Sequence, residues 1–216
     1  MSLTLHFHPL SSYCWKVLIG LYENQTPFRP VIVDLGDAGS RAAFLALSPM
    51  GKMPVLRDDA RGETVPESTV ILEYLDRYYP GPVRLLPTDP DQAWKTRLWD
   101  RFCDCYVQDP MQKIVGDRLR PAGQKDASGV AEARAKLALA CDQIEREVVA
   151  RAWLSGPEFG LADLAASPAL FYADKVQPLG PERPATRAYL DRLMQRPSFA
   201  RVLLEAEPYF GMFPQA

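Results

Sequence analysis

Over the first eighty residues, the spacing of hydrophobic residues switches between the period of a strand and that of a helix. Alternation over residues 3–8 predicts a strand, which ends at Pro9. Ser11 or Ser12 can then cap a helix over residues 13–24. The same analysis predicts, in order, a strand within residues 28–35, a helix over 42–47, two short strands at 55–57 and 64–65, and a helix from 67 to 79.

The predicted order of these elements is β-α-β-α-β-β-α. The stretch from Asp58 to Gly62 supplies a tight turn between the last two strands. A strand-helix-strand unit followed by such a hairpin gives a mixed sheet with helices on its faces. We therefore predict an α/β thioredoxin-like domain over residues 1–81.

Beyond Pro82 the apolar residues recur only at the spacing of a helix. Residues 82–90 have the turn chemistry of a linker, and no convincing strand follows them. We predict that residues 91–216 form an all-α bundle. Apolar residues three or four positions apart mark four helices in it, near residues 94–105, 137–148, 161–165 and 189–194.

One helix start in this second half has a recognisable pattern. Asp163 follows Gly160 by three residues, so its carboxylate can reach back to the Gly160 amide if Gly160 is the N-cap. Phe159 and Leu164 then occupy the positions of a hydrophobic staple. The pattern predicts structure and assigns no chemistry.

Composition narrows the classes of function. Lys and Arg number 25 against 27 Asp and Glu in 216 residues, and a net charge of -2 disfavours a nucleic-acid binder. The absence of an 18-residue apolar run predicts no membrane span, and we expect no secretory signal. Four cysteines are too sparse for a disulfide scaffold, so we expect a cytoplasmic protein.

The spacing of histidines and cysteines disfavours metal chemistry. His6 and His8 share one face of a strand, but no third ligand is near in sequence. Cys103 and Cys105 lie two apart in a predicted helix and so point to different faces. No C-x-x-C occurs, and we expect no metal site.

The loop before the first helix is the first place where chemistry is expected. A helix N-terminus offers free amides and a partial positive charge, which stabilise an anion. A hydroxyl of Ser11 or Ser12 there adds a donor to a bound thiolate. Lowering a thiol pKa by two units takes about 2.7 kcal/mol, and a helix end with a hydroxyl can supply much of it. Plain helix capping is the alternative role of these serines.

Cys14 is a rival nucleophile, since a cysteine near a helix start can itself be a thiolate. It stands one turn inward, where we expect burial. Farther along, Met53 can offer its backbone to an extended peptide, and Lys52 can meet a carboxylate. Ser68 suits an anion at the next helix start, and Glu67 suits an ammonium. Together these features suit a small thiol peptide with an amino-acid head.

The sequence resembles the glutathione transferase superfamily over essentially its whole length. The stretches that carry the resemblance are Ser11 to Val17, Leu47 to Leu56, Pro66 to Leu75 and Gly160 to Asp163. The resemblance implies glutathione as co-substrate, a cis Met53–Pro54 bond and a γ-glutamyl grip by Glu67 and Ser68.

The Ser-Ser-x-x-Trp stretch is most similar to the serine-type, zeta-like transferases. That likeness makes Ser11 the catalytic donor to the thiolate, with Ser12 as a glutathione contact and the near alternative. Tyr13 and Cys14 replace the small Cys-Ser pair usual in that class, so a phenol contact to sulfur stays open. Further departures are Leu18 for a basic residue, Ser48 for asparagine and Gly160 for the usual Ser or Thr cap.

The resemblance also implies a homodimer, in which the first domain of one subunit meets the second domain of the other. It implies a pocket between the domains for a small hydrophobic electrophile. Its expected lining is aromatic and methionine side chains: Tyr13, Phe102, Tyr106, Met111 and Phe210, with Tyr209, Met212 and Phe213 nearby.

The leading hypothesis is a glutathione S-transferase that activates the glutathione thiolate and conjugates or isomerises an apolar electrophile. A maleylacetoacetate isomerase-like enzyme is one alternative. Another is a non-enzymatic, transferase-like binding or regulatory module, suggested by the departures at Tyr13 and Cys14. A thiol reductase using Cys14 is the last alternative.

Overall fold

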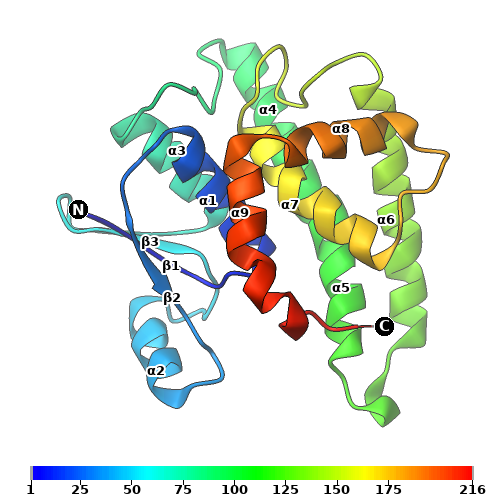
Figure 1. The fold of residues 1–216 in the computed structure, drawn as a ribbon, viewed down its shortest axis with the longest axis horizontal. Helices are drawn as coiled ribbons and strands as arrows, with labels where there is room; N and C mark the ends of the chain where they lie inside the picture. Colours follow the sequence, from blue (N-terminus) through cyan, green and yellow to red (C-terminus); the bar gives the residue numbers. More distant parts are fainter. Residues whose placement is uncertain (1, 216) are drawn as a thin grey trace.

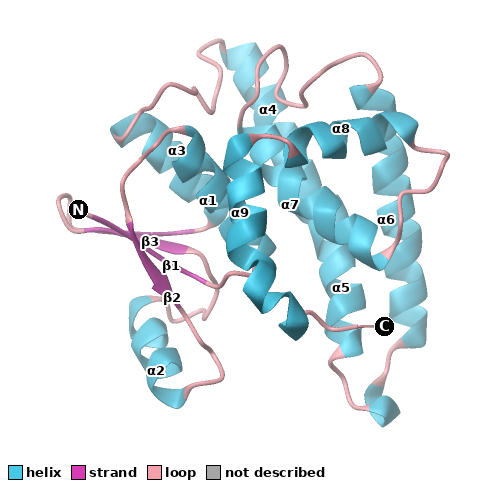
Figure 2. Cartoon of the chain, in the orientation of Figure 1, coloured by secondary structure: helices cyan, strands magenta, loops and turns pink. Residues whose placement is uncertain are grey.

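The chain is described by a computed structural model that covers residues 2–215. A four-stranded mixed sheet with helices on its faces forms the first part (Figure 1). Helices packed into a bundle form the second part, and Figure 2 shows that the strands are confined to the first. The predicted fold class, a thioredoxin-like domain followed by an all-α bundle, is confirmed.

The sheet has the strand order β2-β1-β3-β4. The first two strands are parallel, and the other two pairs are antiparallel. This mixture follows from the connections, because a helix joins the parallel pair and a tight hairpin joins the last two strands. The strands are β1 (Leu3–Phe7), β2 (Arg29–Ile32), β3 (Val55–Asp58) and β4 (Glu63–Pro66).

Helices α1 (Ser12–Glu23) and α3 (Ser68–Tyr78) lie on one side of the sheet, and α2 (Ala38–Leu47) lies on the other (Figure 1). The predicted start of α2 at residue 42 is wrong. The helix begins four residues earlier because the Asp37 side chain accepts a hydrogen bond from the Ser40 amide and caps it.

The second part begins with one continuous helical rod over residues 90–118. The turns in the middle of this rod are π-helical. None of the helices formed by residues 2–215 is long and apolar enough to cross a membrane. The elements are α4 (Pro90–Phe102), the π-helix η1 (Cys103–Gln108), α5 (Asp109–Arg118), the 3₁₀ turn η2 (Ala122–Gln124), α6 (Ala127–Val148), α7 (Leu161–Val176), α8 (Pro184–Met194), α9 (Pro197–Ala206) and the 3₁₀ turn η3 (Glu207–Met212).

Helix α7 is the centre of the bundle, and its start has the predicted capping box. The Gly160 amide donates to Asp163 Oδ2 at 3.0 Å, and the Asp163 amide donates back to the Gly160 carbonyl at 3.0 Å. Phe159 and Leu164, the expected staple pair, are both buried. The signal was readable because capping depends on local spacing.

The larger of two hydrophobic clusters runs through both parts of the molecule, and the smaller one, Val33, Phe44 and Val55, lies between the sheet and α2. Trp15 of α1 is fully buried, and its ring lies 5.2 Å from the Phe171 ring of α7 and 6.0 Å from the Phe199 ring of α9. Helix α1 is therefore packed between the sheet and the bundle. Its N-terminus is fixed by both.

Candidate active site

The serine loop, residues 8–12, ends β1 and opens α1. Ser11 is the N-cap of α1, and its Oγ accepts from the Cys14 amide at 3.4 Å. That bond is long and uses only a lone pair of the hydroxyl oxygen, so the Ser11 proton can be donated to a ligand. Ser11 is half-buried, whereas Ser12 is 6% exposed. Ser11 thus combines a hydroxyl donor with the positive end of a helix.

Side chains of the helical bundle and of α1 hold this loop in place. Tyr172 of α7 donates its hydroxyl to the Leu10 carbonyl at 2.9 Å. Trp15 Nε1 donates to the Pro9 carbonyl at 2.5 Å, and the Leu10 amide donates to His8 Nδ1 at 3.1 Å. The loop backbone is therefore fixed before any ligand arrives, which favours electrostatic stabilisation of a bound anion.

A groove of about 550 Å³ runs from Tyr13 along the β3 and α3 ends of the first domain. It contains Lys52, Met53, Glu67 and Ser68, all expected from the sequence to contact glutathione. The Met53–Pro54 bond is cis. Glu67 has a φ of +69°, a strained conformation for a residue with a side chain.

The far wall of this groove comes from the helical rod. It contributes Arg101, Asp104 and Asp109. Arg101 Nη1 lies 3.1 Å from Asp104 Oδ2, and the same oxygen accepts from the buried Lys16 of α1 at 2.9 Å. Cations and carboxylates of both domains therefore face the same space, which suits a ligand that carries both charges.

The two rivals of Ser11 are held in their protonated forms. Burial raises the pKa of the Cys14 thiol to about 12, and this side chain has no solvent exposure. Burial, together with nearby Asp104 and Asp109, raises the pKa of Tyr13, whose hydroxyl donates to Asp109 at 3.4 Å. Cys14 is placed in the core, so the geometry disfavours it as a nucleophile.

A second hollow, the serine pocket, lies next to this groove and has a volume of about 470 Å³. Gln112 borders both spaces. The polar groups at its base include Ser11, Ser12 and His8. The rest of its wall is largely apolar and comes from α5, α7 and the C-terminal segment: Met111, Val115, Leu119, Tyr172, Met212, Phe213 and Pro214.

Known proteins match the chain over both parts. Residues 5–83 match the model of the glutathione S-transferase N-terminal domain, and residues 102–197 match that of the C-terminal domain. A glutathione S-transferase of Silene vulgaris is 30% identical over 216 residues, covering 94% of this chain and 97% of the relative. The chain belongs to the glutathione S-transferase family.

Two further relatives are similar over most of their length. The crystal structure of a glutathione S-transferase from Methylobacillus flagellatus with glutathione bound superposes with a TM-score of 0.84 at 27% identity, covering 93% of this transferase and 98% of that chain. A maleylacetoacetate isomerase of Pseudomonas aeruginosa is 26% identical over 200 residues, covering 92% of this chain and 93% of the relative.

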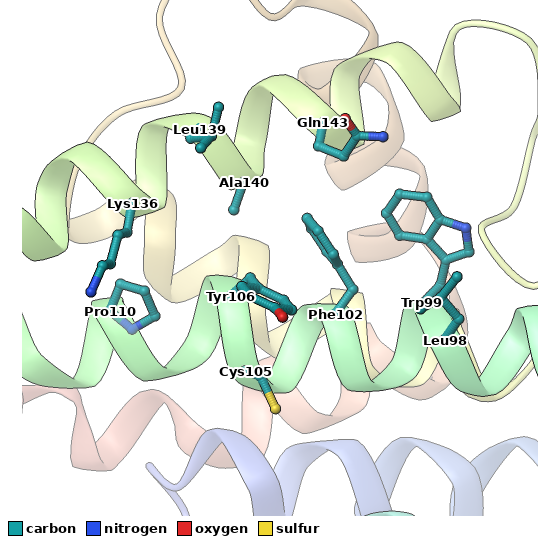
Figure 3. A pocket seen from close by; sticks show the side chains of 10 residues that line it. All are labelled: Leu98, Trp99, Phe102, Cys105, Tyr106, Pro110, Lys136, Leu139, Ala140 and Gln143. Carbon is teal, nitrogen blue, oxygen red and sulfur yellow. The ribbon is translucent and has the colours of Figure 1, made fainter.

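Three of the aromatic residues expected to line the electrophile pocket lie elsewhere. Phe102 and Tyr106 line a separate groove between the helical rod and α6 (Figure 3). They are offset by two residues, about half a helical turn, from the residues that face α1. Phe210 packs against the core, with its ring 6.1 Å from Trp15. Of the set, Met111 lines the serine pocket and Tyr13 lines the neighbouring groove.

Sequence reasoning about this transferase missed Gln108 and Asp104. Both are buried on the rod, at the point where it meets α1. Their signal was available in part, because polar residues four positions apart on an otherwise apolar helix face indicate a polar contact. Within residues 2–215 no group of three or more His, Cys, Asp or Glu has the arrangement of a metal site.

Proposed function

We propose that this glutathione transferase binds glutathione in the groove beside Tyr13 and that Ser11 stabilises its thiolate for attack on an apolar electrophile. The single observation that carries the proposal is the position of Ser11. Its hydroxyl stands at the N-terminus of α1 in the serine pocket, which adjoins the groove. Glutathione supplies the nucleophile, and the protein holds and ionises it.

The groove offers complementary groups along the length of such a peptide. Ser68 at the start of α3 and the adjacent Glu67 suit the γ-glutamyl carboxylate and ammonium. The Met53 backbone suits strand-like pairing with the cysteinyl unit, and Lys52 suits the glycyl carboxylate. This arrangement directs the thiol toward Ser11.

The electrophile is proposed to occupy the serine pocket. Its wall of Met111, Val115, Tyr172 and Phe213 suits a small apolar acceptor rather than a sugar or a nucleotide. The attacking sulfur forms the new bond to carbon. In a substitution the displaced group departs with the electron pair of its broken bond, and in an addition the π electrons move onto the acceptor, which then takes a proton from water.

Replacing Ser11 with alanine tests this mechanism. Turnover of an aryl chloride is expected to fall about 100-fold, because one donor to a developing anion is lost. The glutathione affinity measured by calorimetry is expected to change by less than about threefold, because the groove contacts are intact. Ser40→Ala, at the start of α2, is the control.

Tyr13→Phe separates the phenol from the serine hydroxyls as donors to the sulfur. It should leave turnover near the wild-type value if Ser11 is the donor. Unchanged turnover in Ser11→Ala would contradict the proposal. No glutathione binding in the wild-type protein would favour a binding module instead.

Isomerisation is the second candidate, favoured by the similarity to a maleylacetoacetate isomerase. The same thiolate would add to a conjugated double bond, allow rotation and leave again, so no atom of glutathione is consumed. Incubation of maleylacetoacetate with catalytic glutathione distinguishes the two outcomes, since isomerisation proceeds without loss of free thiol.

We also propose that the protein is a cytoplasmic homodimer. The groove between the rod and α6 has a volume of about 720 Å³ and an apolar wall. Leu98, Tyr106 and Leu139 on it are 54%, 60% and 67% exposed, which is unusual for large apolar side chains and suits a face covered by a second copy. Sedimentation analysis checks the oligomeric state.

A further inference from the structure

Gln108 is the last residue of the π-helix and meets the start of α1 across the domain boundary. Its side chain is only 2% exposed, and it borders the serine pocket together with Ser11 and Ser12. Nε2 donates a hydrogen bond to Ser12 Oγ. The other end of the amide, Oε1, is buried and has no hydrogen-bond partner among residues 2–215.

The bond from Gln108 determines what Ser12 can do. A serine hydroxyl has one proton and two lone pairs, and Gln108 occupies one lone pair. None of the side-chain hydrogen bonds found within residues 2–215 uses Ser12 as a donor. The Ser12 proton is therefore available to an acceptor that enters the pocket.

Packing gives no reason for an amide at this position. A buried carbonyl oxygen without a partner destabilises the folded chain, and an unbranched apolar side chain of similar size would avoid that cost. The π-helical turns widen the rod where it contacts α1, and such turns are frequent at functional sites. Both observations point to the pocket as the reason for Gln108.

We propose that Gln108 is a positioning residue, which holds the Ser12 hydroxyl so that its proton points at the glutathione sulfur. Ser12 then supplies a second donor beside Ser11, and the thiolate is stabilised by two hydroxyls in place of one. This inference rests on the proposed function. It assigns a role to a residue of the second domain in activating a thiol that is bound by the first.

Gln108→Met tests the inference, because methionine is unbranched and close in size but cannot donate. The readout is the pKa of enzyme-bound glutathione, followed by thiolate absorbance against pH. We expect that pKa to rise by about one unit, which is a tenfold loss of thiolate at neutral pH. Glutathione affinity at high pH should stay within about twofold, and the melting temperature should not fall.

Gln108→Glu gives a second, independent variant. A carboxylate would accept the Ser12 proton and turn it away from the sulfur, so the thiol pKa should rise at least as much. Ser12→Ala combined with Gln108→Met should resemble Ser12→Ala alone, because Gln108 acts through that hydroxyl. Gln92→Leu, on the exposed start of α4, is the control and should leave the thiol pKa unchanged.

The outcomes separate the two levels of the mechanism. If Ser11→Ala lowers turnover while both Gln108 variants keep the wild-type thiol pKa, the role of Gln108 is refuted and the proposed function stands. If the effects of Ser12→Ala and Gln108→Met add, Gln108 does not act through Ser12 and the inference is equally wrong. If Ser11→Ala has no effect, the proposed function itself fails.

Discussion

The helical rod formed by α4, η1 and α5 has two faces that differ in almost every property. Its inner face presents Asp100, Asp104 and Gln108 to α1, and all three are buried. Its outer face presents Phe102 and Tyr106 to the groove beside α6, and Figure 3 shows these rings between the two helices. The inner face is polar and buried, whereas the outer face is apolar and partly open.

On this rod the polar side chains are buried against α1, beside the proposed glutathione site, and apolar side chains are exposed on the outer face. Lys16 of α1 lies 2.5 Å from Asp100 and 2.9 Å from Asp104, and it also donates to Thr69 of α3 at 2.8 Å. These bonds tie together the two helices whose N-termini face the proposed glutathione site. Among the residues that the structure describes, the outer face makes no contact of this kind with α1 or α3. Its apolar side chains suit association with another helix surface.

Removing the cation of the inner face gives the largest expected effect. Lys16→Met removes the buried cation that Asp100 and Asp104 share, leaving only the Thr69 hydroxyl on Asp100 and Arg101 on Asp104. It should lower the free energy of unfolding by about 3–5 kcal/mol. Urea unfolding at several protein concentrations measures it. Lys136→Met on the outer rim is the matched control, and it should be nearly silent because its pair with Glu132 is exposed.

The pH dependence of that variant follows from Asp100. Burial raises the pKa of its carboxyl, so the folded chain takes up a proton at a pH where the unfolded chain does not. The stability lost in Lys16→Met should therefore shrink as the pH falls from 7 toward the ordinary carboxyl range near about 4. A loss that grows on acidification would contradict a charged inner face.

The parts of the fold and the site that depend on residues close together in the chain could be predicted from the sequence. The strands, the Gly160 capping box and the serines at the start of α1 depend on neighbours within a few residues, and their patterns were readable. Helix α9 was not predicted, although Phe199, Val202 and Ala206 recur at helical spacing and Pro197 suits the first helical position. That pattern was available in the sequence.

The neighbour that each face of the rod contacts could not be predicted from the spacing of apolar residues. Apolar periodicity shows that a helix has a buried side, but it does not show which neighbour that side meets. Phe102 and Tyr106 were therefore expected at the electrophile, and they lie against α6. Gln108 and Asp104 were missed because their partners, Ser12 and Lys16, are 96 and 88 residues away in the chain.

Cutting apolar contacts on the outer face should give an intermediate effect. The double variant Tyr106→Ser and Leu139→Ser should weaken self-association by roughly 2–4 kcal/mol, because two large exposed side chains lose their burial in the dimer. Sedimentation equilibrium measures the dissociation constant. Unfolding of the monomer should change little, and an unaltered association would place the dimer contact elsewhere.

The smallest effect is expected from Cys103 and Cys105, which differ in exposure and report whether the rod is fixed. Cys103 is fully buried, and burial and the nearby Asp104 raise its pKa well above the usual value. Cys105, two residues later, is exposed and receives a long contact from Arg101 Nη2 at 3.5 Å. Iodoacetamide at pH 8 should therefore modify Cys105 rapidly and leave Cys103 unmodified until the chain unfolds. Cys105→Ser should remove the fast phase, which is followed by mass spectrometry of peptides. Rapid modification of Cys103 in the folded protein would mean that the rod turns or opens at its π-helix, and the two faces would then not be fixed.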